Sequence, residues 1–290
     1  MSELVQFLFS GLTVGAVYAL VGLGFTLIFN ASHVVNFAQG EFVMLGGMTT
    51  VFLGYAGVPL PLAAMVAIIL TAIVGMALYK LAIGPARHGT VVSLIIITIG
   101  ASIFLRGVAQ LVFDKEFHRL PGFSGEDPIQ VLGAALLPQS LWVLGCTLLT
   151  VVGLFLFMNR TMLGKSVVAT SVNRLAAQLV GINVDAILLL SFGLSAAIGA
   201  LGGILITPIT LTSFDAGTML ALKGFAAAIL GGFGNPIGAV VGGLVVGLTE
   251  ALTAGYVSSA YKDAAAFLII LVVLFFFPRG LMGTAAVERV

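Results

Sequence analysis

Long apolar runs are the feature that most constrains the fold of this chain of 290 residues. Inside a membrane no water is present to bond the backbone, so a run of about 20 mostly apolar residues is expected to form a spanning helix. We expect helices at residues 4–29, 34–56, 60–83, 91–113, 140–158, 186–207, 218–232, 237–252 and 264–277. These segments and their short connections account for nearly the whole sequence.

Composition supports the same fold class. Hydrophobic residues make up 60% of the chain and charged residues only 8%, whereas soluble domains carry about 25% charged residues. We therefore predict an all-α polytopic membrane protein, a single transmembrane domain over residues 1–290 with eight or nine transmembrane helices. The turn at residues 231–236 separates two short late segments, which form either two short spans or one span plus a re-entrant segment.

Several function classes are excluded or unsupported. A net charge of +1 without a basic patch gives no support for nucleic-acid binding. Cys146 is the single cysteine and cannot form an internal disulfide. His33, His88 and His118 lie in separate connections, and no zinc-type or hydrolase motif is present, so we expect no metal and no catalytic residue.

The basic residues predict the orientation, because short loops rich in Lys and Arg stay in the cytoplasm. No Lys or Arg precedes Lys80, so the first segment lacks a signal-peptide basic region and is interpreted as a membrane helix. The mixed-charge connection at residues 114–139 suits the outer face. Nine crossings with the N-terminus outside place the third connection, the fifth connection and the tail inside; these contain Lys80, Arg87, Arg160, Lys165, Arg174, Arg279 and Arg289.

Two short stretches echo each other at an offset of 177 residues. Phe37 and Gly40 recur as Phe214 and Gly217, and Gly47 recurs as Gly224. With nine spans the two copies would run in opposite directions, as inverted repeats do in transporters, where they place broken helices near the substrate path. A chance match in a glycine-rich chain is the alternative.

Glycine pairs one turn apart predict close helix packing. They occur at Gly11 and Gly15, at Gly238 and Gly242, and at Gly243 and Gly247. Small residues at this spacing let two backbones approach each other in lipid.

Charges inside apolar segments are costly and therefore suggest function. We expect Arg106 to reach the outer interface with its long side chain, and Asp215 and Glu250 to lie at interfaces. Glu41 and Lys223 lie deeper and are candidates to face a polar cavity. The predicted substrate-path residues are Asn36, Gln39, Gly40, Glu41, Phe214, Asp215 and Lys223. The alternative for the first of them is a polar helix start, with Asn36 near the N-cap and Glu41 in the first turn.

The polar stretch at residues 159–183 is interpreted as a cytoplasmic helix that another protein contacts. Gly164, Lys165 and Ser166 resemble the end of a phosphate-binding loop, but that motif requires glycine where Asn159 stands. We therefore expect no ATPase activity in this chain. A helix lying on the lipid surface is the alternative interpretation of the stretch.

Four stretches together resemble the Liv-type permease of bacterial branched-chain amino acid ABC importers. They are residues 33–42, 175–183, 222–232 and 277–281, and the resemblance keeps its order over essentially the whole length. It implies an ABC-importer permease fold in the bacterial inner membrane and a role in moving leucine, isoleucine or valine. Related permeases serve urea, amides and other amino acids.

The resemblance also implies partners. They are a homologous second permease, two cytoplasmic ATPases that use the ATP, and a periplasmic binding protein; this chain itself would bind no cofactor. The loop at residues 171–183 would be the coupling helix that docks on an ATPase, through Arg174, Leu175, Ala176, Ala177, Gln178, Val180 and Gly181.

Leu175 stands where many ABC permeases carry glutamate. Docking would then depend more on Arg174, Gln178 and shape. From the residues alone, Ala176, Ala177 and Val180 would share one face, and Gly181 would permit a sharp exit.

Two other functions remain open at this point. One is a self-sufficient carrier or channel for a small polar solute, with Glu41 coupling to protons. The other is a purely structural membrane subunit. Uptake by the purified chain alone, without ATP or partners, would distinguish the carrier from the permease.

Overall fold

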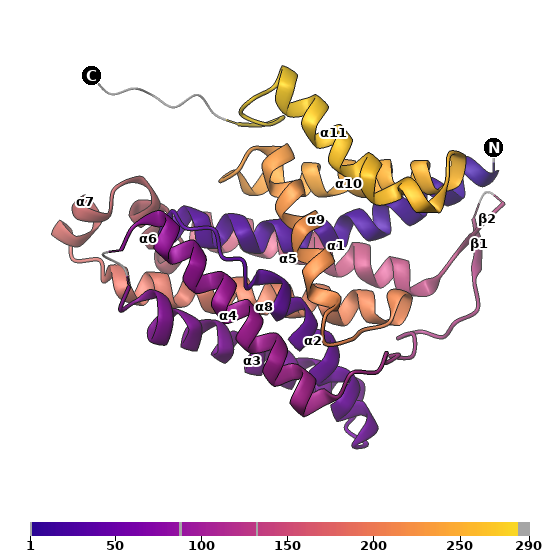
Figure 1. Cartoon of the computed structure of the whole chain (residues 1–290), viewed down its shortest axis with the longest axis horizontal. Coiled ribbons are helices and arrows are strands. Elements are labelled where there is room, and N and C mark those ends of the chain that lie inside the picture. Colours follow the sequence, from indigo (N-terminus) through magenta and orange to yellow (C-terminus); the bar gives the residue numbers. More distant parts are fainter. Residues whose placement is uncertain (1, 87–88, 132, 284–290) are drawn as a thin grey trace.

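The computed structural model describes residues 2–86, 89–131 and 133–283, and Arg87, His88 and Arg289 lie outside these ranges. Within them the chain is built from helices (Figure 1). These are α1 (Ser2–Ser32), α2 (Gln39–Tyr55), α3 (Leu60–Leu78), α4 (Val91–Phe113), α5 (Pro138–Arg160), α6 (Met162–Val172), α7 (Arg174–Leu179), α8 (Val184–Thr210), α9 (Ala216–Gly231), α10 (Pro236–Tyr256) and α11 (Lys262–Phe276).

Three short elements complete the described chain. The π-helical turn η1 (Tyr79–Ile83) extends α3, and the 3-10 turn η2 (Ser259–Tyr261) leads into α11. The strands β1 (Ile129–Val131) and β2 (Ala134–Leu136) form an antiparallel hairpin before α5, with Ile129 opposite Leu136.

All nine predicted segments are helical in the described residues. Seven helices are long and apolar enough to cross a membrane: α1, α3 with η1, α4, α5, α8, α10 and α11 with η2. The eighth segment, predicted to be short, forms the 21-residue α10. The second begins later than expected, at Gln39, because residues 33–38 leave the helical path after α1. Helices α2 and α9 have 17 and 16 residues, so at about 1.5 Å per residue neither spans a core of about 30 Å upright.

The two ends of the molecule agree with the predicted orientation. At one end Gln6 of α1 exchanges two hydrogen bonds with the backbone of Ala135 in β2, so the N-terminus lies with the connection assigned to the outside. At the other end Arg174 of α7 donates to the carbonyl of Ala31 at 3.0 Å. Figure 1 shows the hairpin and α7 at opposite ends of the long axis.

Helices α1, α2 and α3 and helices α8, α9 and α10 are arranged as two equivalent triplets. Helix α2 begins at residue 39 and α9 at residue 216, the offset of 177 that the sequence echo has. The turn that follows each of them contains a glycine with positive φ, +82° at Gly57 and +96° at Gly234. The triplets run in opposite directions, since α1 starts at the outer end and α8 at the inner end.

A clearer signal of this repeat was present in the sequence. The pattern Gly-x-x-Gly-x-Pro ends both copies, at residues 54–59 and 231–236, again 177 residues apart. In each copy it marks the end of one helix, a turn with a left-handed glycine, and the start of the next helix.

The predicted glycine contacts form between α1 and α10. A Cβ at Gly15 would lie 2.9 Å from the carbonyl oxygen of Gly243, and one at Gly247 would overlap the backbone of Gly15. Gly238 and Gly242 pack in the same way on α9, against Gly231 and Ala227. Small residues therefore bring both neighbours of α10 to backbone distance.

Candidate functional site

The centre of the molecule is a direct contact between the two echo stretches. A Cβ placed on Gly40 would overlap the carbonyl oxygen of Gly217, and a Cβ on Gly217 would overlap that of Gly40. Both glycines lie in the first turn of their helices, so the N-terminal ends of α2 and α9 cross here. We call this contact the glycine crossing.

Two of the predicted path residues hold the backbone beside the crossing. The Gln39 side chain is fully buried; its Oε1 accepts from Ser195 Oγ at 2.7 Å, and its Nε2 donates to the Ser195 carbonyl. Asn36 Oδ1 accepts from the Ala38 N–H at 3.1 Å. Asn36 does not cap α2, whose N-cap is Ala38, whereas Glu41 does lie in the first turn.

Glu41 and Arg106 form an ion pair between α2 and α4. Glu41 Oε1 accepts from Arg106 Nη2 at 2.9 Å and from Ser102 Oγ at 2.8 Å. The prediction that Arg106 reaches outward to the interface is therefore wrong. The buried carboxylate, with a side chain 2% exposed, attracts the guanidinium across the two helices instead.

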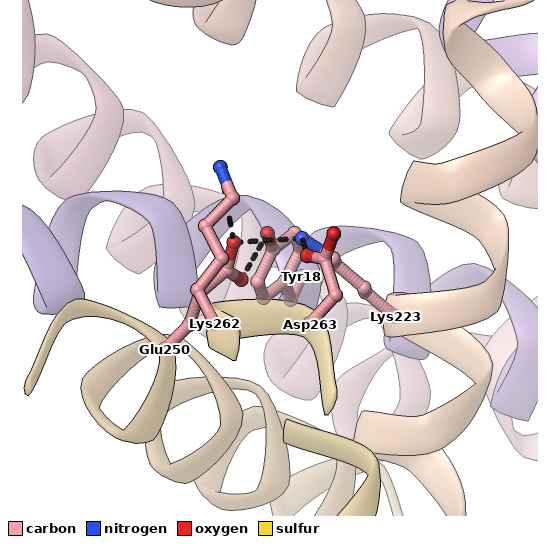
Figure 2. A network of polar contacts seen from close by, with 5 residues as sticks. All are labelled: Tyr18, Lys223, Glu250, Lys262 and Asp263. Carbon is pink, nitrogen blue, oxygen red and sulfur yellow. Dashed lines mark hydrogen bonds and ion pairs between the residues drawn. The ribbon is translucent and has the colours of Figure 1, made fainter. Parts of the chain in front are cut away.

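A second charged cluster joins α1, α9, α10 and α11 (Figure 2). Lys223 Nζ lies 2.7 Å from both Glu250 Oε1 and Asp263 Oδ1, although the geometry to Asp263 falls short of a hydrogen bond. Tyr18 donates its hydroxyl to Glu250 Oε2 at 2.7 Å, and Lys262 lies 3.9 Å from Glu250. Glu250 was predicted at an interface but is buried, because three helices bring partners to it.

Lys223 and Asp215 line one cavity of about 380 Å³ beside the crossing. Lys223 is buried there, as predicted, while Asp215 is exposed and accepts from Ser213 Oγ at 2.6 Å. Phe214 packs against the cluster around Met44 and Met48 on α2. Glu41 lines a different cavity, of about 160 Å³, formed with α4 and the other face of α9. The predicted path residues therefore divide between the two sides of the crossing.

The polar stretch between α5 and α8 is a pair of helices rather than one. Thr161 caps α6 by accepting from the Gly164 N–H at 3.0 Å, and Gly164 packs so closely on α5 that a Cβ would overlap the carbonyl of Phe157. Asn173 then caps α7 by accepting from the Ala176 N–H at 3.0 Å. Gly164 is thus a packing residue, and this part of the chain forms no phosphate-binding loop.

Helix α7 presents an apolar tip. Leu175, Leu179 and Val180 are 74%, 89% and 76% exposed, and Ala176 and Gln178 are exposed beside them. Ala177 is buried against the inner ends of α1, η1 and α8, contrary to its predicted position on the contact face. Arg174, on which docking was predicted to depend, turns inward and donates to the carbonyl of Ala31. Gly181 ends α7 with φ +88°, the predicted sharp exit.

Among the residues that the structure describes, no three His, Cys, Asp or Glu side chains gather where a metal ion could bind. Comparison with known proteins decides the family. Residues 7–275 match the family described as branched-chain amino acid transport system, permease component. The chain belongs to this family.

Individual relatives agree with the family match. The permease is 33% identical to the high-affinity branched-chain amino acid transport system permease protein BraD of Pseudomonas aeruginosa, over 98% of this chain and 97% of BraD. It is 31% identical to LivH of Escherichia coli, with the same coverage. In fold it resembles a chain of PsaBC from Streptococcus pneumoniae, with a TM-score of 0.52, 15% identity, and coverage of 97% and 93%.

The family confirms the predicted class. The protein is a multi-pass membrane permease of an ABC transport system for branched-chain amino acids, and it is not the ATPase of that system. The two alternatives, a self-sufficient carrier and a purely structural subunit, are set aside by this match.

Proposed function

We propose that this permease moves leucine, isoleucine and valine into the cell by alternating access, as one part of a larger importer. Its partners are a homologous second permease, two cytoplasmic ATPases that hydrolyse ATP, and a periplasmic binding protein that delivers the amino acid. Residues 1–290 act as one transmembrane domain, and this chain holds no cofactor.

The exposed tip of α7 is the observation that carries the proposal. Leu175 and Leu179 of the six-residue α7, and Val180 directly after it, are large apolar side chains that are exposed. The tip belongs to the connection that the basic residues assign to the cytoplasm, so water rather than lipid surrounds it in the isolated chain. An apolar patch in water favours a protein contact, and a groove on an ATPase is the partner we assign.

The anchoring of α7 explains how a push on the tip would reach the membrane helices. Arg174 ties the start of α7 to the last turn of α1, and Ala177 packs with Ile28 and Ala31 of that turn. The chain then runs through residues 33–38 into the glycine crossing. Motion of α7 would therefore move the start of α2 together with the end of α1.

We assign the transport pathway to the two cavities beside the crossing. Glu41 belongs to one and Asp215 and Lys223 to the other, while Asn36, Gln39 and Gly40 hold the backbone between them. Phe214 supports the same region from the connection between α8 and α9.

Charge substitutions on the tip test the coupling role. L175E/L179E is expected to abolish co-purification of the ATPases and to lower uptake by at least about tenfold, since an apolar hot spot is worth about 2 kcal/mol or more. Ala177→Glu is not diagnostic, because Ala177 is buried. I129E, an equivalent change on the outer hairpin, is the control and should leave co-purification intact. Normal ATPase binding by L175E/L179E would contradict the proposal.

A further inference from the structure

We propose that the cavity between Glu41 and Arg106 binds the α-ammonium and α-carboxylate groups of the transported amino acid. The inference rests on the proposed function, because it names the substrate groups that one cavity of the pathway recognises. It depends on the ion pair, on its unused bonding positions, and on the aromatic side chains opposite.

The cavity is lined by polar and by aromatic side chains. Glu41, Ser102, Arg106 and Thr218 supply the polar side chains, and Phe25, Phe37 and Phe225 supply aromatic rings. The Phe225 ring centre lies 5.4 Å from that of Phe25 and 5.7 Å from that of Phe37, so the rings form one wall. A small molecule that complements this lining needs both charged groups and an apolar side chain.

The polar side chains of the cavity have bonding positions that the protein itself does not fill. Glu41 Oε1 accepts from Ser102 and Arg106, but Oε2 is buried without a hydrogen-bond partner. Arg106 Nε and Thr218 Oγ1 are likewise buried and unpartnered. A buried carboxylate oxygen and a buried guanidinium N–H without partners are each costly. An ammonium group would satisfy the carboxylate, and a carboxylate would satisfy the guanidinium.

The Lys223 cluster provides a contrast within the same molecule. Lys223 pairs with Glu250 and Asp263, and Tyr18 bonds Glu250, so four helices are joined. Both oxygens of Glu250 have partners, and the one unpartnered atom of the cluster, Asp263 Oδ1, lies 2.7 Å from the Lys223 ammonium. The Glu41 pair differs, because it leaves both an acceptor, Glu41 Oε2, and a donor, Arg106 Nε, without a hydrogen-bond partner.

The position of the cavity fits a pathway rather than a lipid contact. Arg106 lies seven residues before the end of α4, about 10 Å inside the span, and its side chain is 32% exposed. A charged side chain with about a third of its surface exposed to hydrocarbon would cost several kcal/mol. The opening between α4 and α9 therefore faces water or protein, and the second permease is the partner that would cover it in the importer.

Size agrees with a single amino acid. The cavity of about 160 Å³ is well below the roughly 300–1,000 Å³ of sites for drug-sized ligands. Ile99, Ala221 and Leu222 complete its apolar surface. The rings and these aliphatic side chains offer an apolar surface to a branched aliphatic side chain.

Binding to the purified complete importer without its binding protein tests the charge assignment. The probes are L-leucine, L-leucinamide, which lacks the carboxylate, and 4-methylpentanoate, which lacks the ammonium group. We expect saturable binding of leucine in the wild type. E41Q should weaken leucine binding by about tenfold or more and should change 4-methylpentanoate binding far less. R106Q should likewise weaken leucine binding and should change leucinamide binding far less, because leucinamide lacks the carboxylate that Arg106 would bind.

Two further variants separate recognition from folding. E41Q/R106Q carries no unpaired charge, so it should retain assembly with the ATPases and still bind leucine weakly. R119Q breaks the exposed Arg119–Glu126 pair of the outer connection and should bind leucine like the wild type.

The aromatic wall is tested by selectivity. F225W reduces the space beside the ion pair, so uptake should shift from leucine toward valine by about fivefold in the ratio of kcat/KM values. Unchanged selectivity in F225W, together with equal losses for leucine, leucinamide and 4-methylpentanoate in E41Q, would overturn the assignment. If the ATPases do not co-purify with the wild-type permease, that result would instead contradict the proposed function.

Discussion

Glycine at positions 40 and 217 is required by space and not by backbone conformation. Both residues lie in regular helix, and neither is among the described residues with positive φ. What excludes a side chain is the carbonyl oxygen of the opposite glycine. The same physical cause, backbone against backbone, operates between Gly15 and Gly243 on α1 and α10.

Replacing Gly40 by alanine should therefore destabilise the protein by about 1–3 kcal/mol, as overpacking does. Gly54 is the matched control, because it lies in the same helix with no atom near its missing Cβ. Gly54→Ala should raise stability by about 0.4–1 kcal/mol. Thermal unfolding in detergent measures both changes, and equal effects of the two substitutions would contradict the packing explanation.

Residue partners were the least predictable feature of the sequence. Glu41 and Arg106 were both recognised as unusual, yet their pairing depends on the rotation of α2 and α4 about their axes. Hydropathy does not reveal how a helix is rotated about its axis, because a membrane helix is apolar on all sides. Glu250 and Arg174 were misplaced for the same reason, since each is turned toward a partner distant in sequence.

At the scale of elements, the Lys223 cluster holds α9, α10, α11 and α1 together. Lys223→Met would remove the ammonium group that pairs with the buried Glu250 carboxylate. We expect the free energy of unfolding to fall by about 3–5 kcal/mol. K223M/E250Q removes both charges and keeps an acceptor for Tyr18, so it should recover most of the loss. Unfolding temperatures of the two variants in one detergent give the comparison; similar values would argue against an ionic contribution.

The docking of α7 should depend on pH through His33. Burial, together with the positive charge of Arg174, lowers the pKa of His33 below 6.5. The docked state therefore favours neutral imidazole. Its full stability is present above about pH 6.5 and declines as pH falls toward the lowered pKa, where the undocked state binds the proton more strongly.

A fluorophore on Q178C, in a C146A background, measures this effect as mobility of the α7 tip. Anisotropy should fall between pH 7.5 and pH 5.5. In H33N, which tolerates the φ of +56° at this position, the change should disappear. A pH response that persists in H33N would assign it to another group.

At the scale of the whole molecule, the sequence predicted more. The nine apolar segments, and the division of the connections between the two ends of the molecule, follow from transfer energies and charge, which depend little on packing. The internal repeat was predicted only as an alternative to chance, because two glycines and a phenylalanine carried it. The sequence did not predict how far into the molecule α2 and α9 begin. An apolar run shows composition, but it does not show at which residue the helix starts or which helix it contacts there.

Labelling of single cysteines checks the orientation. In a C146A background, E126C should react with a membrane-impermeant maleimide in intact cells, and Q178C only after permeabilisation. These residues lie in the connections assigned to opposite sides, and both are exposed. Reaction of Q178C in intact cells would reverse the assigned topology.

In the proposed alternating access, the glycine crossing would also serve as a pivot. Because the backbones of Gly40 and Gly217 meet there directly, neither glycine has a side chain that would block a change in the angle between α2 and α9. Such a rotation would swing the outer end of α2 and the inner end of α9 in opposite directions. A small displacement applied on the cytoplasmic side would then be converted into the reverse displacement outside, which is the motion that exchanges one open gate for the other.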